Sequence, residues 1–107
     1  MVQPIIQELI THLKTQLKKS GIHIDKIILF GSYSTEKATS NSDVDIIIVS
    51  DDFKGKDIFE RAEMIKEVYI LTLKQYHLPL DIILLSSDEY HQETTLAASL
   101  AQEGLIV

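Results

Sequence analysis

The chain has 107 residues, of which 45% are hydrophobic and 24% charged, with two prolines and no cysteine. This length and composition fit one globular domain, residues 1–107, with one modest core. They exclude disorder, a collagen-like repeat, disulfides and any site built on cysteine. The formal net charge of −6 argues against a long nucleic acid as a direct substrate, because such binding depends mostly on Lys and Arg.

The sequence gives no sign of a targeting or membrane segment. The first fourteen residues carry polar side chains at helical spacing, where a signal peptide would have an unbroken apolar core. No other stretch approaches the length of a membrane span. We therefore expect a cytoplasmic protein that does not contact a membrane.

The first half of the chain predicts a helix and two strands. The helix follows Pro4 and stops at residues 18–21, and its apolar side chains recur at helical spacing: Ile6, Leu9, Ile10, Leu13 and Leu17. Residues 26–30 predict a strand that meets a tight turn at Gly31-Ser32. The polar segment after it predicts a loop with one helical turn at its start. Residues 43–50 predict a second strand, apolar on both faces as in a sheet covered on both sides.

The second half predicts a helix, a strand and a last helix. Residues 51–56 predict a turn, and a long helix from Asp57 should end before Pro79. Its expected apolar face is Ile58, Ala62, Ile65, Val68 or Tyr69, Thr72 and Tyr76. Residues 80–85 predict the third strand. Ser86 and Glu89 form a capping box for one last helix to about Ala101, with Gly104 as its C-terminal cap.

Three carboxylates interrupt these predicted strands. Asp43 and Asp45 open the second strand, and the alternation of side chains along a strand turns both toward one face. Asp81 lies in the apolar run LPLDIILL, where a buried charge is costly unless it is paired or binds a metal. Three carboxylates on neighbouring strands would form an oxygen-rich site suited to Mg²⁺.

Gly31-Ser32 could hold a phosphate. A glycine at a strand-to-turn junction lets the backbone approach the phosphate, while the following amides and the Ser32 hydroxyl donate hydrogen bonds. Each feature also has a purely structural explanation: a turn for Gly31-Ser32, a polar strand edge for Asp43 and Asp45, and a strand-end residue facing water for Asp81. The joint order of strand, Gly-Ser, Asp-x-Asp, helix and strand with Asp favours the functional interpretation.

This arrangement resembles the nucleotidyltransferase superfamily that includes DNA polymerase β, and most closely its minimal nucleotidyltransferase (MNT) branch. The resemblance runs from FGSYSTEKATSNSDVDIIIV through LDIILL to AQEGLIV. It implies the polymerase β-like fold of α/β (α+β) class, a small mixed β-sheet flanked by helices. It also implies that Gly31 and Ser32 hold the triphosphate of ATP, that Asp43 and Asp45 bind two Mg²⁺ ions, and that Asp81 binds one of them and helps to deprotonate an attacking hydroxyl.

One segment departs from the family. After Gly-Ser, members often have a small residue and then Arg-Gly, whereas this chain has Ser34, Thr35 and Glu36. The usual Arg charge is missing, and Lys37 does not stand at the family's position, so turnover could be weakened. Tyr33, beside the turn, could stack on a base, accept a nucleotide or simply pack.

Three functions fit the resemblance. The chain lacks the added helical domain of the antibiotic-modifying relatives, which favours the small MNT antitoxins that pair with a separate helical HEPN toxin. In that case it would transfer AMP from ATP to a tyrosine of the HEPN protein. Alternatively it would be a catalytically weak binding module that inhibits the HEPN protein by contact. Transfer to a small molecule such as an aminoglycoside is the third possibility. A homodimer is also possible, because so small a domain has little material to cover its sheet.

Overall fold

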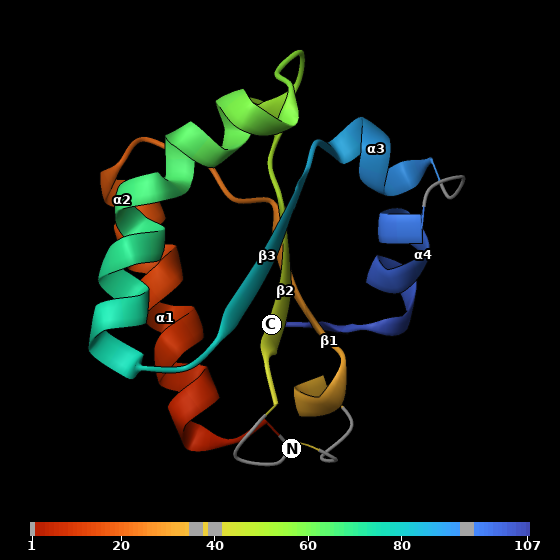
Figure 1. Ribbon diagram of the computed structural model, residues 1–107. Helices are drawn as coiled ribbons and strands as arrows, with labels where there is room; N and C mark the ends of the chain where they lie inside the picture. Colours follow the sequence, from red (N-terminus) through yellow and green to blue (C-terminus); the bar gives the residue numbers. More distant parts are fainter. Residues whose placement is uncertain (1, 35–37, 39–41, 93–95) are drawn as a thin grey trace.

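The computed structural model describes residues 2–34, 38, 42–92 and 96–107. In chain order the elements are α1 (Pro4–Lys19), β1 (Lys26–Phe30), the 3-10 helix η1 (Ser32–Ser34), β2 (Val44–Val49), the 3-10 helix η2 (Asp51–Phe53), α2 (Ile58–Tyr76), β3 (Leu80–Leu85), α3 (Ser87–His91), α4 (Leu96–Glu103) and β4 (Leu105–Ile106). The helices lie on both sides of one sheet, with α1 and α2 on one side and α3 and α4 on the other (Figure 1). The predicted mixed sheet flanked by helices is confirmed.

The four strands are arranged in the order β3-β2-β1-β4. β1 pairs with β2 antiparallel and with β4 antiparallel, whereas β2 and β3 run parallel. The long α2 makes the crossover that a parallel pair requires. β3 is therefore an edge strand, and β2 is paired on both sides.

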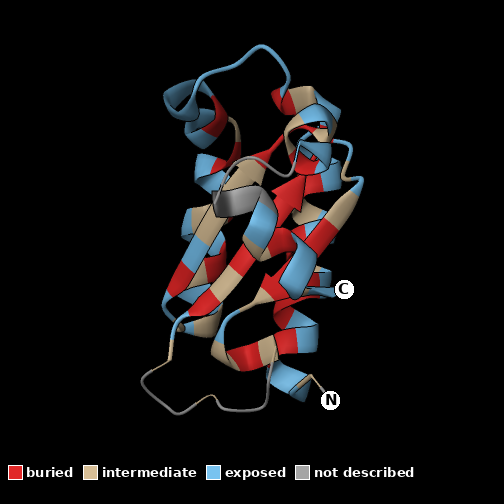
Figure 2. Cartoon of the chain, turned by 90° about the vertical axis from the view of Figure 1, so that its right-hand side faces the viewer, coloured by how far each residue is buried: buried red, intermediate tan, exposed pale blue. Residues whose placement is uncertain are grey.

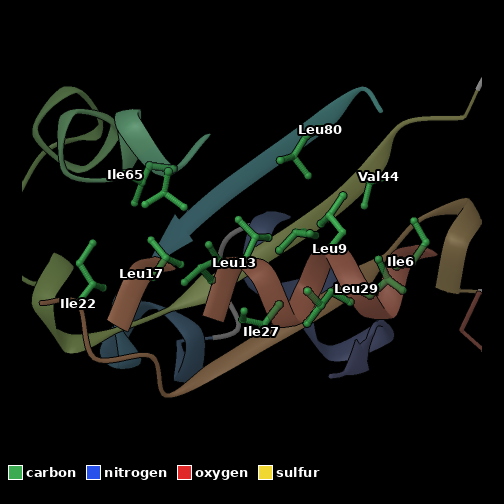
Figure 3. Packing of buried hydrophobic residues seen from close by; sticks show 14 of the residues in the cluster. Ile6, Leu9, Leu13, Leu17, Ile22, Ile27, Leu29, Val44, Ile65 and Leu80 are labelled. Atoms are coloured by element: carbon green, nitrogen blue, oxygen red, sulfur yellow. The ribbon is translucent and has the colours of Figure 1, made fainter. Parts of the chain in front are cut away.

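The alternation of side chains along β2 divides the core into two layers. Ile46 and Ile48 join the larger cluster, which α1 and α2 cover, while Ile47 and Val49 join the smaller cluster on the opposite face. All five apolar residues predicted for the first helix are buried in the larger cluster. Figure 3 shows the α1 side chains packed against side chains of β1, β2, β3 and α2. The prediction that β2 is apolar on both faces is confirmed.

The apolar face predicted for α2 is wrong in its first turns. Ile58 is 73% exposed, and Ala62 is also exposed. Arg61 is buried in their place. Its guanidinium donates to the carbonyl oxygens of Lys56 and Leu84 and to Glu89 Oε1, the last at 2.6 Å. Those acceptors satisfy the buried charge, so an arginine occupies a position where helical periodicity predicted apolar residues.

The sequence analysis predicted one last helix to about Ala101, whereas the structure has two helices in this part of the chain. The capping box of Ser86 and Glu89 is present, but the helix that it opens ends at His91. The pKa of Glu89 is lowered, because hydrogen bonds from Ser86 and Arg61 outweigh the effect of burial, which on its own would raise it. α4 then forms a separate helix. Within the described residues, no helix has both the length and the apolar character needed to cross a membrane.

Gly104 does not act as a left-handed helix cap, since the glycines with positive φ are Gly21, Gly31 and Gly55. A side chain at Gly104 would come within 2.8 Å of the Leu29 carbonyl oxygen. The glycine therefore lets the chain approach β1, and residues 105–106 form β4, a strand that the sequence analysis did not predict.

Candidate active site

β1 ends in a sharp turn that only a glycine adopts without strain. Gly31 follows Phe30 with φ +73°, in the left-handed region. The Ser34 amide and hydroxyl both donate to the Gly31 carbonyl oxygen, at 3.1 and 2.7 Å, and hold η1 against the strand end. A Cβ built on Gly31 would lie 2.3 Å from Asp45 Oδ2. The predicted turn is confirmed, and it lies directly beside one of the predicted carboxylates.

Asp45 and Asp81 stand opposite one another on neighbouring strands. The parallel register of β2 and β3 pairs Asp45 with Asp81. Residues paired in this way project to the same face of the sheet. For Asp45 this is the face of Ile47 and Val49, which α3 and α4 cover. Figure 1 shows that these two helices lie away from the end where β2 and β3 begin, so both carboxylates lie at the less covered end of this face.

Asp43 lies outside the strand that it was predicted to open. β2 begins at Val44, and Asp43 is exposed just before it. Strand alternation therefore does not fix where Asp43 points. Its charge still acts on Asp45, because the pKa of Asp45 is raised by burial first, then by Asp81 and then by Asp43. The three carboxylates thus form one electrostatic group with an excess of negative charge.

The burial pattern agrees with this arrangement, since β1 and β2 are buried along most of their length, whereas β3 is buried only at its two ends. In Figure 2 the exposed residues gather at the helices and loops. The described part of the site therefore joins a glycine turn, Asp45 on an interior strand, and an exposed Asp81 on the edge strand.

Comparison with known proteins decides the family. The sequence matches the nucleotidyltransferase domain family over residues 6–100, a range that includes the glycine turn and all three carboxylates. The chain belongs to this family. A crystal structure of a Sulfolobus solfataricus protein assigned as a nucleotidyltransferase has the same fold, with a TM-score of 0.60 and 18% sequence identity, over 99% of this chain and 87% of that chain. A search of the curated proteins found no match.

The donor atoms of this nucleotidyltransferase domain fit Mg²⁺. In the part of the chain that the structure describes, no three His, Cys, Asp or Glu side chains gather closely enough to enclose a metal ion by themselves. Mg²⁺ seldom uses such a cage, because it binds through one or two carboxylates, water and substrate phosphates. Asp45 and Asp81 offer carboxylate oxygens whose mutual repulsion a cation would relieve. The predicted roles of the three aspartates as metal ligands stay predictions.

The residues that follow Gly31 differ in how far they are buried. Tyr33 is only 8% exposed and belongs to the larger core cluster, which favours packing over the stacking or acceptor roles considered for it. Ser32 is half-buried. In the segment that departs from the family, Ser34 ends η1, whereas Thr35 and Glu36 lie outside the described residues, as does Lys37.

The sequence analysis missed the contact that joins α2 to the strand bearing Asp81. Tyr69 donates its hydroxyl hydrogen to the Leu80 carbonyl oxygen at 3.0 Å, and Arg61 donates to the Leu84 carbonyl oxygen at 3.0 Å. Both acceptors are backbone atoms of a distant segment, and no sequence pattern indicates them. A local signal was available for the start of α2, where Asp57 and Glu60 form a capping box.

Proposed function

We propose that this nucleotidyltransferase domain transfers AMP from ATP to a hydroxyl group of a protein, and that the acceptor is a tyrosine of a helical HEPN-type partner. The observation that carries the proposal is the in-register pair of Asp45 and Asp81 beside the Gly31 turn. It places carboxylates next to a backbone turn suited to a phosphate, which is the pairing that nucleotidyl transfer needs.

Each residue has a role in the proposed reaction. Gly31 and Ser32 hold the triphosphate, and Asp43, Asp45 and Asp81 hold two Mg²⁺ ions. When bound, Mg²⁺ supplies charge that stabilises the attacking and leaving oxygens. Asp81, which is exposed on the edge strand, accepts the proton of the acceptor hydroxyl. The hydroxyl oxygen forms a bond to the α-phosphorus, the bond from that phosphorus to the bridging oxygen breaks, and pyrophosphate leaves.

Attack at the α-phosphorus, and not at the γ-phosphorus, follows from what the sequence lacks. The Gly31-Ser32 turn is not part of a Gly-x4-Gly-Lys loop, which is the usual clamp for a transferred γ-phosphate. The product on the acceptor should therefore be AMP and not phosphate.

The test uses ATP labelled at either the α or the γ position, with the purified chain, Mg²⁺ and the helical protein encoded beside it. Label from the α position alone should appear on a tyrosine of the partner. Asp81→Asn should suppress transfer at least a hundredfold while weakening nucleotide binding much less, because Asp81 is assigned to proton transfer as well as to the metal. Asp51→Asn is the matched control, since Asp51 is an exposed carboxylate beyond the opposite end of β2.

Nucleotide binding is measured separately by thermal unfolding. Mg²⁺ and ATP together should raise the melting temperature more than either alone, and saturation at 100 times the dissociation constant corresponds to about 2.7 kcal/mol. Asp43→Asn should abolish this shift. Transfer of the γ-label would overturn the mechanism, and tight partner binding without transfer of either label would identify a binding module that acts by contact.

A further inference from the structure

Asp81 lies on a strand that has a neighbour on one side only. Among the described strands, β3 pairs with β2 alone. Each peptide group of such an edge strand lacks one of the two hydrogen bonds that an interior strand makes, so the edge strand opens more easily. Asp81 is also the second residue of β3, close to the strand end, where fraying is greatest. The transfer that we propose nevertheless needs its carboxylate at a fixed place.

Tyr69 of α2 supplies the missing hydrogen bond at the peptide group that joins Leu80 to Asp81. Its hydroxyl donates to the Leu80 carbonyl oxygen at 3.0 Å. On the other side of the strand, the Val44 amide donates to the Pro79 carbonyl oxygen at 2.8 Å. This parallel pairing, with Val44 opposite Leu80, turns the Asp81 amide toward β2. The peptide group before Asp81 is therefore held from both sides, as it would be in an interior strand.

The two hydrogen bonds restrict the direction in which the Asp81 side chain leaves the strand. A peptide group is planar, and the Cα that carries the Asp81 side chain lies in the plane of this one. The side chain projects to the face of the sheet that Asp45 shares, whereas α2 lies on the other side (Figure 1). Tyr69 therefore acts on Asp81 through the backbone, from the side of the sheet opposite the carboxylate.

The hydroxyl of Tyr69 is itself held in a definite place. Tyr69 is half-buried and packs against the larger core cluster, and Val68 and Thr72 on the same helix are buried. Because packing already fixes the ring, the hydrogen bond to Leu80 costs little further side-chain entropy. A phenylalanine would fill the same space and leave the Leu80 carbonyl without this donor.

We infer that Tyr69 is a positioning residue for Asp81, because it holds the Leu80–Asp81 peptide group from the outer edge of β3 and thereby fixes the carboxylate assigned to the acceptor hydroxyl. This inference rests on the proposed function and adds to it a residue that acts through the backbone alone. Arg61 donates to the Leu84 carbonyl oxygen at 3.0 Å, so α2 supports the edge strand near both of its ends.

The test compares Tyr69→Phe with Tyr76→Phe in the full chain. Tyr76 is the matched control, because it is half-buried on the same helix and its hydroxyl donates to one backbone carbonyl, that of Glu8, at 3.2 Å. With the helical partner and α-labelled ATP, Tyr69→Phe should lower kcat at least tenfold. The KM for ATP should change less than twofold, because the Gly31 turn and Asp45 do not belong to β3. Tyr76→Phe should change both values less than twofold.

Amide hydrogen exchange of the chain without nucleotide gives a second measurement that needs no transfer. The Asp81 amide should exchange at least tenfold faster in Tyr69→Phe than in the parent, and less than twofold faster in Tyr76→Phe. The Leu85 amide, at the other end of β3, should exchange alike in the two variants. The comparison separates a local loosening at Asp81 from a general loss of stability, which would affect both variants.

Three results would overturn the inference. They are equal exchange of the Asp81 amide in the two variants, a kcat of Tyr69→Phe within twofold of the parent, and a rise in the KM for ATP as large as the fall in kcat, since Tyr69 would then act on the nucleotide. Failure of the proposed function looks different. A parent chain that transfers no α-label would refute transfer, and the exchange of the Asp81 amide alone would then decide whether Tyr69 holds the strand.

Discussion

Replacing Gly31 by alanine should destabilise the fold more than the same change at other left-handed glycines. Gly31 and Gly55 have nearly the same φ, +73° and +77°. A Cβ at Gly55 meets nothing within 4 Å, whereas at Gly31 it lies 2.3 Å from Asp45 Oδ2. Gly55→Ala should therefore show only the backbone penalty, about 1–2 kcal/mol. Gly31→Ala adds the energy of moving Asp45 out of its rotamer, about 1 kcal/mol more.

The free energy of unfolding is measured by urea titration at neutral pH, with unchanged m-values showing that only stability has moved. A double-mutant cycle with Asp45→Ala isolates the clash, and a coupling of about 1 kcal/mol between positions 31 and 45 is expected. Equal losses for Gly31→Ala and Gly55→Ala, with no coupling to position 45, would refute the contact between the glycine turn and the carboxylate.

Two further changes test the charges. Asp45→Asn should stabilise the metal-free protein at pH 7 by about 1 kcal/mol, the screened repulsion expected between carboxylates about 5 Å apart on neighbouring strands. Because the folded pKa of Asp45 is raised above its ordinary value of 3.8, the parent should lose stability as pH rises from about 3.8 through that folded pKa, and the variant should lack this loss. A variant less stable than the parent at pH 7 would contradict the assignment. Arg61→Met should lower the free energy of unfolding by about 2–3 kcal/mol, because Glu89 and the Leu84 carbonyl lose their donor. Lys54→Met, which breaks only the exposed pair with Asp88, should lower it by no more than about 0.5 kcal/mol in the same urea titration.

The elements that sequence patterns predicted well are those in which the spacing of apolar residues along the chain directly reflects which residues are buried. The apolar residues of α1 recur at helical spacing because one face packs on the sheet, and the helix observed is Pro4–Lys19. β1 and β3 were predicted with the bounds that they have, since each is a mostly apolar run between turn residues, which in β3 only Asp81 interrupts. In these segments local preference and burial agree.

The parts that were mispredicted depend on distant partners. Arg61 is buried only because acceptors from β3 and α3 reach its guanidinium. β4 is two residues long and forms because β1 offers it a free edge. Neither contact leaves a periodic signal, so helical spacing gave the wrong face for the start of α2, and the end of the chain was left without a strand.

The candidate site shows the same limit. The sequence singled out the candidate carboxylates but not how they meet, because the pairing of Asp45 with Asp81 is a matter of register between two strands. Alternation along β2 was extended one residue too far, to Asp43, which lies before the strand. The proximity of Gly31 to Asp45 follows from the antiparallel pairing of Phe30 with Asp45 and could not be inferred from spacing.

The position of each carboxylate in the sheet suits a different part of the proposed reaction. Asp45 lies on β2, which is hydrogen-bonded on both sides and packed between the two core layers, so its backbone is fixed and its carboxylate lies beside the Gly31 turn. Asp81 lies on the edge strand β3 and is exposed. A transferase must keep its nucleotide and metal fixed while acceptors bind and leave, and precise sites are built on rigid elements. An interior strand for the carboxylate nearest the Gly31 turn, and an edge strand for the carboxylate that we propose meets the acceptor, satisfy both requirements within one small sheet.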